Sequence, residues 1–97
     1  MKIIFIGKFE KIWDEQGKAV SLEKLGHEVI RVEEPYLNSM SYNPKFDELI
    51  QQFIDIKPDV VIYTKLRINH PMRFINKMKQ NGILTVSWFP DYCNVGR

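Results

Sequence analysis

The chain has 97 residues, of which 44% are hydrophobic and 27% are charged, as in an ordinary globular domain. Its length suits one domain over residues 1–97. Its net charge of +2 is too mild to predict a nucleic-acid-binding surface. Cys93 is the single cysteine, which excludes an internal disulfide and fits a reducing compartment, so we expect a cytoplasmic location.

The first predicted element is a strand at the N-terminus. Residues 2–6 form an apolar run closed by Gly7, which is typical of a strand buried on both faces of a parallel sheet. The run is far too short to cross a membrane, so we expect no membrane span.

A helix and a second strand should follow. The spacing predicts a helix from about Asp14 to Leu25, with Gly26 just beyond its end. The apolar residues of its buried face are Ala19, Val20, Leu22 and Leu25. Residues 27–32 alternate between polar and apolar side chains and predict a strand. His27, at the start of that strand, is interpreted as a structural turn residue.

The middle of the chain predicts a loop and then a clear helix. Residues 33–44 contain two prolines and several Ser and Asn residues, and they are interpreted as a loop. Residues 45–56 match the helical apolar template. The matching residues are Phe46, Leu49, Ile50, Phe53 and Ile54.

The last third predicts strand, helix and strand. Residues 60–63 form the third strand, and residues 83–89 form the fourth. Between them Pro71 suits the first position of a helix, with His70 or Asn69 as its cap. That helix should bury Phe74, Ile75 and Met78 and end at Gly82.

This alternation predicts an α/β domain of the three-layer Rossmann-like or flavodoxin-like kind. The order is β-α-β-α-β-α-β, which favours a parallel sheet of about four strands with helices on both faces. The first strand should lie inside the sheet, beside the second. The flavodoxin-like order puts the third strand on its other side, so that the chain reverses between strands one and three.

Ligands of such sheets bind beyond the carboxyl ends of the strands. A basic set is predicted at that edge, with Lys8 after the first strand and four further residues around the start of the third helix. Those four are Lys65, Arg67, His70 and Arg73. They suit an anionic group such as phosphate or carboxylate; the alternative is ordinary solvated surface charge. No glycine-rich phosphate loop follows the first strand, so we expect no cofactor.

Trp88 and Asp91 follow the fourth strand at the same edge. An aromatic ring can stack on a sugar, and a carboxylate can bind its hydroxyls. Alternatively, Trp88 packs beneath the next segment and Asp91 caps a helix. Asp14, after the first strand, could likewise serve a bound substrate or cap a helix, and the helix cap is the favoured interpretation.

Four segments resemble the N-terminal domain of GT-B glycosyltransferases, especially the spore-maturation-type branch. They are MKIIFIG, SLEKLGHEVIRVE, FDELIQQFIDIKPDVVIYTK and INKMKQNGILTVSWFPD. The resemblance implies an acceptor-side domain that works with a separate domain for the nucleotide-sugar donor. It also implies that this chain is a fragment, a truncated gene product or a minimal stand-alone relative, and that it does not transfer sugar alone. The family's histidine base is missing after the first strand, so Asp14 or Glu10 is the candidate base.

One alternative accompanies this interpretation. The chain could be a stand-alone, non-enzymatic α/β module that binds a small anion or a protein partner. In either case an open sheet edge near Trp88 and Phe89 predicts self-association into a homodimer.

Overall fold

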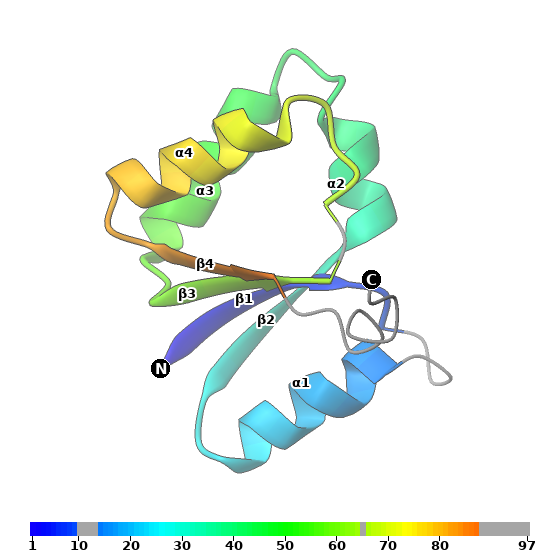
Figure 1. Ribbon diagram of the computed structural model, residues 1–97, viewed down its shortest axis with the longest axis vertical. Helices are drawn as coiled ribbons and strands as arrows, with labels where there is room; N and C mark the ends of the chain where they lie inside the picture. The colour runs from blue at the N-terminus through cyan, green and yellow to red at the C-terminus, as the bar shows by residue number, and fades with distance from the viewer. Residues whose placement is uncertain (10–13, 65, 88–97) are drawn as a thin grey trace, which may run out of the picture.

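The computed structural model describes residues 1–9, 14–64 and 66–87. Its strands form one parallel sheet in the order β2-β1-β3-β4 (Figure 1). The strands are β1 (Lys2–Gly7), β2 (Glu28–Glu33), β3 (Val60–Tyr63) and β4 (Leu84–Ser87). The helices are α1 (Asp14–Lys24), α2 (Glu34–Met40), α3 (Phe46–Ile56) and α4 (Pro71–Gln80). The predicted α/β, Rossmann-like class and the flavodoxin-like strand order are confirmed.

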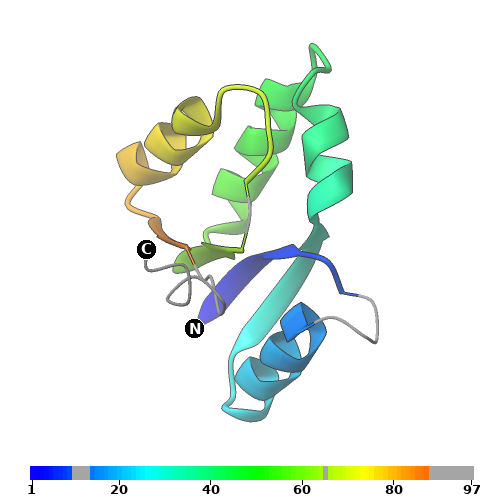
Figure 2. The ribbon, with the colours of Figure 1, turned by 45° about the vertical axis from the view of Figure 1, so that its right-hand side comes forward.

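Helices cover both faces of the sheet and make three layers. α2, α3 and α4 lie on one face and α1 on the other, as Figure 2 shows from a second direction. β1 is buried on both sides because Ile4 and Ile6 join the core beneath α2–α4, while Ile3 and Phe5 join Ala19 of α1. The N-terminal apolar run therefore supplies the centre of the domain.

Two glycines end helices in the same way. Gly26 has φ +96°, and the N–H of His27 donates to the carbonyl of Leu22 at 3.2 Å. Gly82 has φ +73°, and the N–H of Ile83 donates to the carbonyl of Met78 at 3.0 Å. This is the Schellman arrangement, which satisfies the last helical carbonyls with a left-handed residue. The helix ends predicted at these glycines are confirmed.

The predicted loop over residues 33–44 is wrong, because α2 occupies much of it. Pro35 lies in the first turn, where proline's missing N–H removes no helical hydrogen bond. Leu37 is fully buried beneath the helix and joins the main core. A proline interpreted as a loop signal is here part of a helix start.

Smaller differences concern the ends of elements. Leu25 lies beyond α1 and is 74% exposed, so it does not belong to the buried face that the sequence predicted. His70 occupies the cap position before Pro71, as predicted, but its side chain makes no capping hydrogen bond with the described residues. Trp88 and Phe89, predicted in the last strand, lie outside the described residues.

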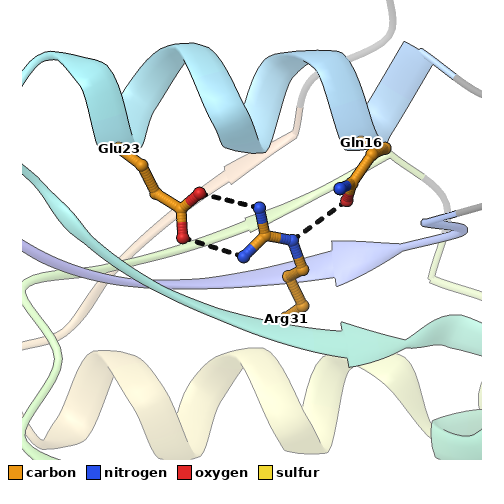
Figure 3. A network of polar contacts seen from close by, with 3 residues as sticks. All are labelled: Gln16, Glu23 and Arg31. Carbon is orange, nitrogen blue, oxygen red and sulfur yellow. Dashed lines mark hydrogen bonds and ion pairs between the residues drawn. The ribbon is translucent and has the colours of Figure 1, made fainter. Parts of the chain in front are cut away.

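A polar network ties α1 to the sheet (Figure 3). Arg31 of β2 donates two hydrogen bonds of 2.8 Å to the carboxylate of Glu23 and one of 3.0 Å to Gln16 Oε1. The hydrogen bond from the guanidinium lowers the pKa of Glu23 below its ordinary value. Such a two-pronged pair fixes direction as well as distance, so it orients α1 on β2.

Candidate functional site

The carboxyl ends of all four strands lie at one edge of the sheet because every pairing is parallel. β2 lies on one side of β1, and β3 lies on the other. The direction in which the chain adds strands to the sheet therefore reverses between β1 and β3. Lys8 follows β1 at this point and is half-buried. Lys65, Trp88 and Asp91 lie outside the described residues, and so does the side chain of Asp14.

Beside this edge, two connections border a hollow of about 240 Å³, here called the α3–α4 hollow. One connection joins α2 to α3, and the other joins β3 to α4. α3 and α4 both begin on the side of the carboxyl ends, because each runs back toward the amino end of the next strand (Figure 1). The lining residues are Ser41, Asn43, Pro44, Phe46, Asp47, Asn69, His70 and Arg73.

Two polar contacts hold the walls of the hollow together. The buried hydroxyl of Ser41 accepts a hydrogen bond of 2.9 Å from the backbone N–H of Asn69 and donates one of 2.6 Å to the carbonyl of Asn38. On the outer side, Nη2 of Arg73 lies 2.5 Å from both carboxylate oxygens of Asp47. The Ser41–Asn69 bond and the Asp47–Arg73 pair each join one wall of the hollow to the other without a ligand.

The ion pair changes the predicted electrostatics. Arg73 is paired with Asp47, and both side chains are about half exposed, at 51% and 58%. Such an exposed pair adds little stability, but the Asp47 carboxylate neutralises the positive charge of Arg73 that would otherwise attract a phosphate. Of the predicted basic set, His70 and Arg73 come together in the hollow. Arg67 is exposed and, like Lys8, is not among its lining residues.

His70 stands at the junction of two hollows. Its backbone is left-handed, at φ 55° and ψ 63°, and its side chain is exposed. It also lines a wider neighbouring hollow of about 500 Å³ with Pro71, Met72 and Arg73. A non-glycine residue with positive φ is uncommon, although histidine is enriched there. This turn carries the chain from the β3 connection into α4.

Glu34 is a buried acid near the same edge, at the first position of α2 after β2. Glu34 is only 6% exposed, and its Oε2 has no hydrogen-bond partner among the residues that the structure describes. A buried carboxylate oxygen without a partner is costly. Its sequence signal is the pair of acids at the boundary, where Glu33 ends β2 and Glu34 begins α2.

His27 lies at the amino edge, away from the hollow. Its Nδ1 is 3.2 Å from the N-terminal amine of Met1, and the next residue, Glu28, pairs with Lys2 at the start of β1. The prediction that His27 lies opposite the carboxyl edge is confirmed.

Within residues 1–9, 14–64 and 66–87, no three His, Cys, Asp or Glu side chains gather in a way that could hold a metal ion. In the same part of the chain, none of the helices has the length and hydrophobicity needed to cross a membrane. No protein-family model matches the chain, and no curated protein or solved structure shows significant similarity to it. Its function is therefore inferred from the fold, the carboxyl edge and the α3–α4 hollow.

Proposed function

We propose that this chain is the acceptor-side domain of a glycosyltransferase of the GT-B kind. The observation that supports this most is the strand order, whose reversal between β1 and β3 is where Rossmann-like sheets bind small molecules. The α3–α4 hollow opens on the same side of the domain. Both features are consistent with an acceptor bound beyond the carboxyl ends.

The donor, a nucleotide-sugar, is proposed to bind to another domain. The sequence after β1 reads KFEKIWDEQGK, without the closely spaced glycines that let a backbone approach a diphosphate. In the complete reaction an acceptor hydroxyl oxygen bonds to the anomeric carbon of the donor sugar, and the bond to the nucleotide breaks. The hydroxyl proton passes to a base, for which Asp14 at the start of α1 remains the candidate.

The cellular location is also a proposal. A single cysteine in 97 residues suits a reducing compartment, and we assign the domain to the cytoplasm on that ground.

One observation favours the second candidate, a stand-alone module that binds a small anion. Arg67, in the connection from β3 to α4, is exposed and has no ion-pair partner among the described residues. A guanidinium so placed can hold a phosphate or carboxylate by two hydrogen bonds. Against it, the nearby Arg73 is already neutralised by Asp47.

Amide-resolved NMR titration separates the two functions. The ¹⁵N-labelled chain is titrated with UDP-glucose, UDP, inorganic phosphate and a panel of monosaccharides and sugar phosphates. The acceptor-domain proposal predicts that a saccharide shifts amides after β1 and β3, such as Lys8 and Thr64, whereas UDP causes no shift. Tight binding of UDP would contradict it, and binding of phosphate without any saccharide would favour the anion-binding module.

A further inference from the structure

We infer that the α3–α4 hollow binds a neutral polyhydroxyl ring, a monosaccharide unit, in preference to a phosphate. This inference rests on the proposed function, because it names the chemical class of the acceptor. It replaces the anionic ligand that the basic residues of the sequence predicted.

The first argument is the kind of polar group in the lining. Asn69 has an amide that can both donate and accept, and the amide N–H groups of Asn43 can donate, while its Oδ1 already accepts a hydrogen bond of 2.8 Å from the backbone N–H of Lys45. Asp47 only accepts, and Arg73 only donates. A sugar hydroxyl also donates and accepts, so neighbouring hydroxyls can use both sides of such a set. An ionised phosphate offers acceptors almost exclusively, and the Asp47 carboxylate would then face it unfavourably.

The second argument is charge. Among the residues that line the hollow, Arg73 is the one lysine or arginine and Asp47 is the one acid. Their side chains are already paired across the two walls. A neutral ligand can share hydrogen bonds with both groups and leave the pair intact. An anion has to compete with Asp47 for the guanidinium, and this competition lowers its affinity.

The third argument is size and surface. Drug-sized ligands occupy sites of about 300–1,000 Å³, and at about 240 Å³ the hollow suits one sugar ring better than a nucleotide. Phe46 lines the hollow but is only 5% exposed, so it adds a small apolar surface for the C–H face of a ring. Tyr42, next to the lining residues Ser41 and Asn43, is largely exposed.

The fourth argument is preorganisation. The Ser41–Asn69 hydrogen bond joins the two connections, and the Asp47–Arg73 pair joins the first turns of α3 and α4. A ligand therefore does not have to order the walls, and less binding free energy is lost on association.

The test is binding of free monosaccharides to the labelled chain. Glucose, galactose, mannose and N-acetylglucosamine are titrated alongside inorganic phosphate, and the perturbed amides are mapped. The expected result is that at least one sugar shifts signals of Asn43, Asp47, Asn69 and His70. Replacing Asn69 by alanine should then weaken that sugar about fivefold, the loss expected for one neutral hydrogen bond.

Asp55→Asn is the matched control. Asp55 is an exposed acid on the same helix as Asp47, eight residues away and therefore about 12 Å along the axis. Its replacement should leave sugar affinity unchanged. A well-dispersed amide spectrum checks that each variant is folded, and Asp47→Asn provides an isosteric second variant of the lining, also expected to weaken the sugar.

Several results would overturn the inference. They are the absence of any sugar binding, sugar binding that leaves the hollow unperturbed, and phosphate binding more tightly than every sugar in the hollow. If a different acceptor shifts the amides after β1 and β3 while the amides of the hollow do not shift, the inference fails and the proposed function stands. If the chain binds UDP tightly, the proposed function fails, whatever the hollow binds.

Discussion

Replacing Asp47 by asparagine should convert the α3–α4 hollow from a neutral site into a weakly anion-binding one. Asparagine keeps the size and one oxygen of the side chain but removes the charge that neutralises Arg73. The guanidinium then has no carboxylate within the lining to pair with. The variant should bind inorganic phosphate more tightly than the unchanged chain does.

The magnitude follows from the exposure of the pair. Both side chains are more than half exposed, so the carboxylate acts on a bound anion through a medium close to water. Two unit charges about 4 Å apart in water interact by about 1 kcal/mol, which corresponds to about a fivefold change in the dissociation constant. Salt screens this interaction, so the gain should shrink at high ionic strength.

Phosphate titrations followed by amide chemical shifts measure this change at low and at high salt. Asp55→Asn is the control, because it removes the same charge from the other end of α3. The reasoning would be refuted if Asp47→Asn and Asp55→Asn bound phosphate equally at low salt, since the pairing would then not be what disfavours an anion.

Three further predictions concern stability and association. Glu23→Gln should destabilise the chain at neutral pH but not in acid. The pKa of Glu23 is lowered in the folded chain, so the stabilisation from its carboxylate is lost as the pH falls through that value. Urea unfolding of the variant and the unchanged chain at both pH values checks this. Leu37→Ala should cost about 2–5 kcal/mol in the same assay, since Leu37 is fully buried, and a loss below 1 kcal/mol would mean that α2 is not docked as described. Leu84→Lys should abolish the self-association that we predict through β4, the edge strand of the sheet formed by the described residues, where Leu84 and Val86 are 61% and 37% exposed. Sedimentation that shows a monomeric unchanged chain at high concentration would contradict this prediction.

Elements with strong periodic patterns could be predicted from the sequence. The run that forms β1 is buried on both faces, and the five apolar residues of α3 follow the helical template, so each pattern reports the packing directly. Gly26 and Gly82 mark helix ends because the left-handed conformation there is costly for other residues. These features predict the order of the helices and strands. Because connections between parallel strands are short and right-handed, that order leaves few possible topologies.

The helix α2 could not be predicted in this way. It is seven residues long, and Leu37 is its one fully buried apolar side chain. Its stability comes from docking on the sheet and not from an amphipathic pattern, so a short window of sequence carries little signal. Pro35 is compatible with both a loop and a first helical turn, and the local sequence does not distinguish them.

The sequence predicts only some of the residues that line the hollow. His70 and Arg73 were expected at the carboxyl edge because they follow β3, and both line it. Ser41, in the connection before α3, and Asp47, in the first turn of α3, lie more than 20 residues earlier in the chain, and only the folded chain brings them opposite Asn69 and Arg73. Charge counted along the sequence therefore overstated how positive the site is.

The most direct test of the account is to detect contacts between a bound sugar and the protein. Isotope-filtered NOE spectra of the labelled chain with an excess of the best-binding monosaccharide report which side chains lie against the ring protons. The account predicts NOEs from the ring to Phe46 and His70, in the α3–α4 hollow. NOEs confined to the amino edge of the sheet, for example to His27, would contradict it.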